Sequence, residues 1–505
     1  MTTKHDQYVL LQQSEFISEK PHPVRLKTEM NGNTVSLESF SSVKALNGKN
    51  IVFDTGGPVW AMSWAPQPSA SSAQYQYLVT CSHKTFSSTS YRSSHTADYP
   101  ENLLQIWRIE VSTGQENNLT DAKFMHGLVH DYGKVWSLDW CPSGAFQQNE
   151  CLGALAAACS DATIRIFIVK FPKESNKFFK VNSNKTLIIG HTEAIGDCCL
   201  HVTWHRGPGH RFIAASFKSG LVAIWDISSH SSLLNTKDGL LPMHCWSAHN
   251  SSVMSISLSS SEINTNPAYC LTGGTDRCYK FWDLRDTTAP LQQIKRGMVT
   301  SVSWLPGLAA AAISHDDVYL QAHTQSLLTD SGFDRNTGTV GSTAQPIVAQ
   351  NSCIWDQSLS TWLGSLAVVT SAGELVVYVL PDATKPVDQN KSNVRRRTYI
   401  YIIEANYDKN EDDPRNNEIQ FHDLWGKDIC DEDKEMQKKV IYSETMRMED
   451  LTCYPITSLN RVSWNPNIGY HGIIASGGQS GLVRIDLLSF LCKNELFCNE
   501  SDTEI

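Results

Sequence analysis

The chain has 505 residues, of which 41% are hydrophobic and 19% are charged, a composition typical of folded soluble proteins. Its 42 basic and 52 acidic residues give a formal net charge of −10. The surface as a whole therefore repels nucleic-acid phosphates, which disfavours strong DNA binding by this chain alone. The apolar runs at 151–159 and 305–313 are far shorter than the roughly 18 residues that span a bilayer. The first residues also lack a signal-peptide pattern, so we expect a protein of the reducing cell interior.

Residues 1–49 are polar, contain scattered prolines and show no sustained hydrophobic period. They predict a tail that is flexible or that a partner orders. Residues 50–57 (NIVFDTGG) are different, because their apolar run is typical of a strand.

From residue 59 onward one irregular unit recurs seven times. Each unit has a run containing Val or Ile followed by Trp, then a short apolar run, then an alternating run that often ends in Trp, and most units have a fourth run next to them. Short alternating runs bounded by Gly, Ser, Asp and Pro predict antiparallel strands. Four strands in each repeated unit predict an all-β fold, a seven-bladed β-propeller with long inter-blade insertions. The seven units lie at 59–107, 135–167, 194–226, 253–285, 299–322, 353–380 and 456–486.

The last unit ends near residue 486 without a fourth strand, so we expect the N-terminal strand at 50–57 to complete it and to close the propeller. The propeller would then occupy residues 50–486, and residues 487–505 would form a C-terminal tail. Residues 324–350 are rich in Ser, Thr and Gly and predict a loop insertion. The second insertion, 381–450, has 29 charged residues among 70, although 395–404 predicts an outer strand. Because the sixth unit is the poorest match, a six-bladed ring remains an alternative.

The sequence shows no recognisable catalytic, metal-binding or nucleotide-binding motif. None of the 14 cysteines forms a CxxC pair, and Cys81, Cys159 and Cys270 lie in apolar runs, which indicates buried thiols. The chain has no phosphate-binding loop, no dinucleotide-binding glycine pattern and no nucleophile elbow. We therefore expect no catalytic residues, no metal and no cofactor.

Several blade residues resemble the WD-repeat signature, in which a Gly-His pair opens a unit and Trp-Asp ends its third strand. In the fourth unit His249, Asp276 and Trp282 occupy the positions that hydrogen-bond across a WD blade, whereas in the third unit Ser219 replaces the Asp. We expect these residues to stabilise blades: Gly190, His191, Trp225, Asp226, His249, Asp276, Trp282 and Asp283.

Five residues are candidate partner contacts. Trp60 and Trp136 follow the first Val of their units and predict either packing between blades or aromatic anchors at the channel mouth. Lys295 and Arg296 could contact phosphate. Arg285 completes a Trp-Asp-Leu-Arg element that resembles the one by which some WD-repeat proteins join cullin-based ubiquitin ligases.

Longer segments resemble a particular family. Residues 129–145, 152–174 and 273–295 are similar to the WD-repeat subunit of general transcription factor IIIC, which serves RNA polymerase III. The resemblance implies a nuclear, non-catalytic scaffold that packs against the largest subunit and supports recognition of the internal B-box of transfer RNA genes. This chain would contact promoter DNA mainly through the complex, and we expect no membrane among its partners. The alternatives are a ubiquitin-ligase substrate receptor that uses Arg285 and a histone-tail reader, which would need an aromatic cage.

Overall fold

The structure is a computed structural model, and the part of the chain that it describes contains strands and no helix. This confirms the all-β prediction. No helix that could cross a membrane occurs in the described part. The described residues are 8–11, 24–27, 34–45, 48–68, 75–83, 102–112, 118–142, 146–147, 150–190, 197–259, 266–295, 297–305, 310–316, 323–329, 345–350, 352–360, 362–379, 397–406, 418–424 and 456–488.

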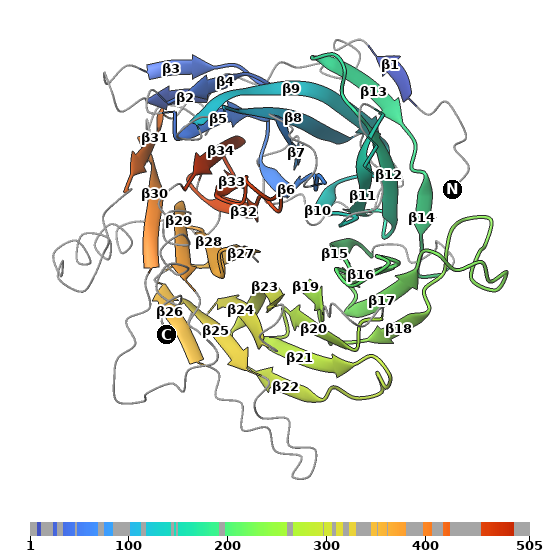
Figure 1. The fold of residues 1–505 in the computed structure, drawn as a ribbon. Coiled ribbons are helices and arrows are strands. Elements are labelled where there is room, and N and C mark those ends of the chain that lie inside the picture. Colours follow the sequence, from blue (N-terminus) through green and yellow to red (C-terminus); the bar gives the residue numbers. More distant parts are fainter. Residues whose placement is uncertain are drawn as a thin grey trace, which may run out of the picture.

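The strands form seven sheets, which Figure 1 shows side by side in a ring. Each sheet begins with an inner strand. Each inner strand contacts that of the next sheet, and the last, β32, also contacts the first, β6. The inner strands are β6 (Val59–Trp64), β10 (Val135–Trp140), β15 (Cys199–Trp204), β19 (Val253–Leu258), β23 (Met298–Leu305), β27 (Ile354–Ser360) and β32 (Leu459–Trp464).

The second and third strands of each sheet follow in antiparallel pairing, as expected for runs joined by short turns. The second strands are β7 (Tyr75–Ser82), β11 (Cys151–Cys159), β16 (Phe212–Phe217), β20 (Tyr269–Gly274), β24 (Ala310–Asp316), β28 (Ser365–Thr370) and β33 (Ile473–Gly478). The third strands are β8 (Asn102–Ser112), β12 (Ile164–Lys170), β17 (Leu221–Asp226), β21 (Cys278–Asp283), β25 (His323–Thr329), β29 (Glu374–Val379) and β34 (Leu482–Leu487).

The fourth strands complete the sheets on the outside of the ring. In five sheets the fourth strand directly follows the third in the chain, and in the second sheet β13 of the first sheet intervenes between them. In the seventh sheet the fourth strand is β5 (Asn50–Asp54), whose Asp54 pairs with Leu482 of β34. The other fourth strands are β9 (Asn118–His130), β14 (Lys185–Leu187), β18 (His244–Ser247), β22 (Gln292–Lys295), β26 (Gln345–Gln350) and β30 (Arg397–Asn406).

The hydrophobic core lies between neighbouring sheets. Side chains of successive strands point to opposite faces, and both faces are covered by the adjacent sheets, so the second strands are almost continuously apolar. In β11, for example, every residue from Cys151 to Cys159 is buried. One core cluster joins the first and last sheets, with Trp64 and Trp107 packed in the same cluster as Ile473 and Val483. Burying that apolar surface stabilises the contact between the two ends of the chain.

The structure differs from the predicted tail at residues 1–49. Four short strands lie there, and three of them extend sheets formed by distant parts of the chain. β1 (Tyr8–Leu11) pairs with β13 (Lys177–Val181), β2 (Val24–Lys27) with β31 (Glu418–Asp423), and β4 (Ser42–Lys44) with β5. β3 (Thr34–Leu37) pairs with β2. Because each strand is very short, and because β1 and β2 have remote partners, the local sequence carries little sign of them.

The two predicted insertions also contain strands. The sequence predicts a loop at residues 324–350, but β25 lies at the start of this segment and β26 at its end. The first run, HTQSLLT, is largely polar, the second, QPIVAQ, has only three consecutive apolar residues after a proline, and neither alternates clearly, so the periodicity criterion misses them. Within 381–450 the strand predicted at 395–404 is confirmed as β30, and β31 follows it in the same sheet. The described part of the chain ends at residue 488, and most of 487–505 lies beyond it.

Candidate functional site

The inner strands are joined to one another by side chains of one strand that accept hydrogen bonds from backbone N–H groups of the next. The acceptors are Ser and Asp side chains at alternate positions of the strand. Strands of different sheets share no main-chain hydrogen bonds, and these short polar side chains pair with the backbone N–H groups instead. The pairs are Asp139 with Trp204 (2.7 Å), Ser255 with Val302 (3.1 Å), Ser257 with Trp304 (2.9 Å), Asp356 with Val462 (3.2 Å) and Ser358 with Trp464 (3.1 Å).

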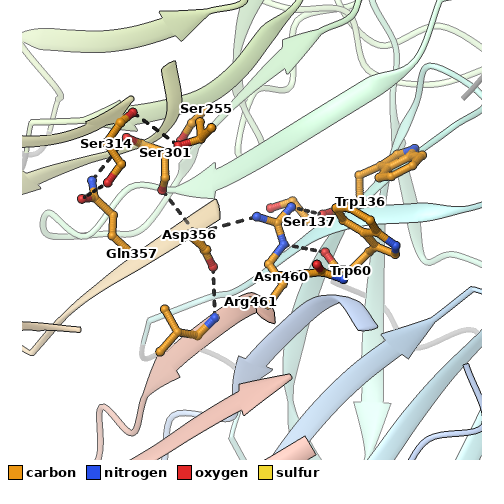
Figure 2. Close-up of polar contacts among 12 residues, drawn as sticks. Trp60, Trp136, Ser137, Ser255, Ser301, Ser314, Asp356, Gln357, Asn460 and Arg461 are labelled. Carbon is orange, nitrogen blue, oxygen red and sulfur yellow. Dashed lines mark hydrogen bonds and ion pairs between the residues drawn. The ribbon is translucent and has the colours of Figure 1, made fainter. Parts of the chain in front are cut away.

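Arg461 of β32 joins four sheets at the centre of the ring. Its Nε donates to the carbonyl of Trp60 (2.6 Å) and a terminal guanidinium nitrogen donates to the carbonyl of Trp136 (2.9 Å). The other terminal nitrogen lies 3.7 Å from the carboxylate of Asp356. Figure 2 shows Arg461 between Asp356 on one side and the two tryptophans on the other. The guanidinium therefore ties β32 to β6, β10 and β27.

Burial raises the pKa of the Asp356 carboxyl, and the nearby guanidinium of Arg461 counteracts this shift. Asp356 also accepts a hydrogen bond from Ser301 at 3.2 Å. The neighbouring Gln357 accepts a hydrogen bond from the Ser314 hydroxyl (Figure 2). It also donates one to the carbonyl of Ala312. The charged groups at the centre are thus satisfied within the chain.

A cluster of apolar side chains, which we call the aromatic plug, covers one end of the inner strands. It consists of Trp60, Trp136, Cys198 and Leu200, with Met254 packed against it. The rings of Trp60 and Trp136 meet edge to face at 5.8 Å, and those of Trp60 and Trp355 at 6.1 Å. Trp60 and Trp136 are only 8% and 6% exposed. This burial is typical of packing between sheets, the first of the two roles predicted for these residues; contact with a partner stays a prediction.

Beyond the plug lies a central cavity of about 1140 Å³. It is lined by the inner strands from the third residue onward and by the turns that follow them, and the lining includes Ser137, Asp139, His201, Asp356 and Arg461. Two carboxylates of the lining have guanidinium partners, Asp139 with Arg206 and Asp356 with Arg461. The cavity wall is thus a mixture of apolar and polar side chains, and its charges are balanced inside the chain.

The fourth sheet contains the hydrogen-bond network that the sequence predicts there. His249 lies within 2.9 Å of Asp276 through Nδ1 and 2.8 Å of the Thr272 hydroxyl through Nε2, and the Trp282 indole donates to the same hydroxyl at 2.9 Å. Burial lowers the pKa of His249, partly offset by the bond to Asp276. A Cβ at Gly274 would lie 2.7 Å from both His249 Nδ1 and Asp276 Oδ1, so this network requires glycine at that position.

The third sheet uses a different arrangement. Ser219, at the position of the expected Asp, donates its hydroxyl and its N–H to the carboxylate of Asp197 (2.7 and 3.0 Å). The Trp225 indole donates to the carbonyls of Ile188 and Leu240. A carboxylate located before β15 thus replaces the missing one.

The remaining predicted residues do not come together in one place. Asp226 and Asp283 accept bonds from residues two positions later, namely Ser228 and Arg285. Gly190 faces open space, and Lys295 lies exposed at the end of β22. His191 and Arg296 lie outside the described residues. Among the described residues no group of three or more His, Cys, Asp and Glu side chains could hold a metal ion, and the described cysteines are free thiols.

Sequence reasoning missed Arg461, Asp356 and the serines of the inner strands. A signal for the serines is present: VMSISL, VTSVSW and WDQSLS each carry small polar residues at alternate positions within an apolar strand. That alternation indicates a strand in which the side chains on one face make hydrogen bonds. For Arg461 there is no local signal, because its partners lie 325 and 401 residues away.

Two segments of the chain are similar to WD repeats. Residues 123–167 and 241–283 match the family model described as WD domain, G-beta repeat. The second match contains the His249–Asp276–Thr272–Trp282 network.

Over most of its length the chain is similar to subunits of one transcription factor. It is 28% identical over 521 aligned positions to general transcription factor 3C polypeptide 2 of Homo sapiens and to that of Pongo abelii, covering 90% of this chain and 54% of each relative. It is 25% identical over 444 positions to transcription factor tau subunit sfc6 of Schizosaccharomyces pombe, covering 87% of this chain and 65% of that protein. The chain thus spans about half the length of the two mammalian relatives. These matches confirm the resemblance seen in the sequence.

Proposed function

We propose that this chain is a non-catalytic assembly subunit of a general transcription factor IIIC. The observation that carries the proposal is the similarity to general transcription factor 3C polypeptide 2 over 90% of the chain. The relatives are named as transcription factor subunits, and such subunits act by binding other molecules. In this role the chain supports binding of the factor to the internal B-box of transfer RNA genes and recruitment of RNA polymerase III in the nucleus.

As part of this proposal, residues 50–486 form a seven-bladed β-propeller whose blades are the seven sheets. Two observations support it: the inner strands contact one another in sequence from β6 to β32, and β32 contacts β6. β5 then closes the ring by pairing with β34 of the last blade. Such a ring is a rigid support whose turns and outer strands offer several surfaces to partners.

The net charge of −10 agrees with DNA contact made mainly through companion subunits, above all the largest one. The ubiquitin-ligase alternative has no support among the relatives. Its key residue, Arg285, directs its guanidinium to Asp283, two residues earlier.

The test is isolation of the tagged full chain from nuclear extract at moderate salt, followed by mass spectrometry and by a binding assay with a transfer RNA gene fragment. We expect the other factor IIIC subunits to be recovered and the fragment to be retained, with loss of retention when the B-box is mutated. Recovery of a cullin adaptor without those subunits would overturn the proposal. The matched variant Arg285→Ala should leave the recovered subunits unchanged.

A further inference from the structure

The two ends of the inner strands differ in what they present to solvent. Near their first residues lies the aromatic plug, whose members are almost completely buried. At the other end five residues each lie two positions beyond the last residue of an inner strand, and all five line the central cavity. An inner strand of six residues rises about 3.3 Å per residue, so this end is roughly 20 Å from the plug. We call this end the mouth; its five residues are Pro66, Pro142, Arg206, Trp362 and Pro466.

An apolar patch adjoins the mouth. Trp362, in the turn after β27, is 49% exposed, and Ile468, in the turn after β32, is 51% exposed. The Trp362 indole donates to the carbonyl of Pro466 at 2.9 Å and thereby joins the two turns. Asn467 anchors the second turn to the first sheet through the N–H of Gln67 (2.7 Å). Both side chains are therefore exposed on turns that hydrogen bonds hold in place.

The two basic and two acidic side chains of the cavity lining balance, but the exposed charge at the mouth is a guanidinium. Four charged side chains of Asp, Glu, Lys or Arg line the cavity. The carboxylates of Asp139 and Asp356 are only 11% and 15% exposed, and Arg461 is 20% exposed. Arg206 is 52% exposed, and it uses one terminal nitrogen for Asp139 at 2.6 Å. A guanidinium has five N–H donors, so Arg206 retains donors that can reach an incoming carboxylate.

We propose that the mouth binds a peptide segment of a companion subunit, with an apolar side chain seated on Trp362 and Ile468 and an acidic residue paired with Arg206. This inference rests on the proposed function, since it takes the partner from the same complex. Exposed Trp and Ile side chains on ordered turns are the kind of surface that anchors partners, and Arg206 selects negative over positive segments by charge. The plug lies at the opposite end of the inner strands.

The first experiment places a benzophenone photo-crosslinking side chain at position 362 of the full chain and isolates the assembled complex. A matched protein carries the same group at position 233, because Leu233 is 84% exposed but lies in the β17–β18 connection, away from the mouth. We expect crosslinks from position 362 to concentrate in one segment of a companion subunit that contains both apolar and acidic residues. Crosslinks only within this chain, to DNA, or to a basic segment would overturn the proposal.

The second experiment measures the affinity of a synthetic peptide that spans the crosslinked segment. We expect the double variant Trp362→Ser, Ile468→Ser to bind at least tenfold more weakly, and Arg206→Gln at least threefold more weakly with a smaller salt dependence. Leu233→Ser should bind within twofold of the unmodified chain. Equal affinities for all four proteins would overturn the proposal; folding of each variant is checked by thermal unfolding.

The two proposals fail in different ways. If the factor IIIC subunits do not co-purify with the unmodified chain, the proposed function is wrong and the docking proposal falls with it. If they co-purify but the 362 and 233 positions give the same crosslinks, only the docking proposal is wrong.

Discussion

The guanidinium of Arg461 donates a hydrogen bond of 2.9 Å to the backbone carbonyl of Trp136, although 325 residues separate the two in the chain. The same guanidinium reaches the carbonyl of Trp60 and the carboxylate of Asp356. One side chain near the C-terminal end thus holds inner strands of the first, second and sixth sheets in place. The ring depends on such links because neighbouring sheets share no ladder of main-chain hydrogen bonds.

Replacing Arg461 with Met should lower the free energy of unfolding by about 3–5 kcal/mol. The change leaves the carboxylate of Asp356 and two buried carbonyl groups without their partner, which is the costly way to break a buried ion pair. Urea unfolding followed by tryptophan fluorescence measures the effect. Arg285→Met is the control, since that side chain is 65% exposed and pairs with Asp283 only two residues earlier, so its loss should leave the unfolding midpoint unchanged. Similar losses for both variants would contradict the role given to Arg461.

Deleting residues 50–57 should give insoluble protein. The deletion removes β5 and with it the buried apolar side chains of Ile51 and Phe53. It also leaves the backbone edge of β34 unpaired. Deleting residues 8–11 is the matched control, because β1 lies at the outer edge of its sheet and Val9 and Leu10 are each 62% exposed. We expect the control to remain soluble, as judged by gel filtration of the supernatant. A soluble, monodisperse protein without 50–57 would show that β5 is dispensable.

Asp276→Ala should destabilise the protein by about 1–3 kcal/mol, because the buried imidazole of His249 then loses its partner at 2.9 Å. Ser219→Ala in the third sheet should cost about 0.5–1 kcal/mol, since the bond to Asp197 is exposed to water. Thermal and urea unfolding of the two variants compare the networks directly. An equal or larger loss of stability for Ser219→Ala would mean that the buried network of the fourth sheet stabilises the protein no more than the exposed bond of the third sheet does.

The protein should lose stability as the pH falls below about 6.5. Burial lowers the pKa of His83 to about 3 and that of His130 to about 4, so both stay neutral in the folded protein. An unfolded chain takes up these protons below its ordinary His pKa of about 6.5. Their contribution is complete above that pH and is lost as the pH falls toward 4, by about 1.4 kcal/mol per pH unit for each histidine.

The variant His130→Gln isolates this effect. Burial raises the pKa of Asp486 to about 6, which acts in the opposite direction between about pH 4 and 6, so the total slope combines both signs. Urea unfolding at pH 7, 6 and 5 measures how the free energy of unfolding changes with pH. This slope should be smaller in His130→Gln than in the unmodified chain by the contribution of one histidine. Identical slopes would contradict the lowered pKa of His130.

Much of the strand pattern was predictable because it depends on local periodicity. The runs at 59–64 and 135–140 alternate in a way that indicates strands, and both are strands in the structure. β13 shows the limit: it follows β12 of the second sheet in the chain, yet it pairs in parallel with β9 of the first sheet. No pattern within a short run specifies which remote strand it will join.

The candidate site was predictable only in part, for the same reason. The residues of the WD network lie within 34 positions of one another, from His249 to Trp282, and fixed spacing reveals them. The mouth is built from turns of different sheets, and Trp362 and Arg206 are separated by more than 150 residues. Only folding brings them to the rim of one cavity, so neither residue stands out in the sequence.

Depletion of this protein from a nuclear extract, followed by transcription of a transfer RNA gene in that extract, tests the central claim most directly. We expect that transcription by RNA polymerase III is lost, that adding back the complex isolated through the tagged chain restores it, and that a gene without a B-box does not respond. Undiminished transcription after complete depletion would contradict the assignment of this chain to factor IIIC.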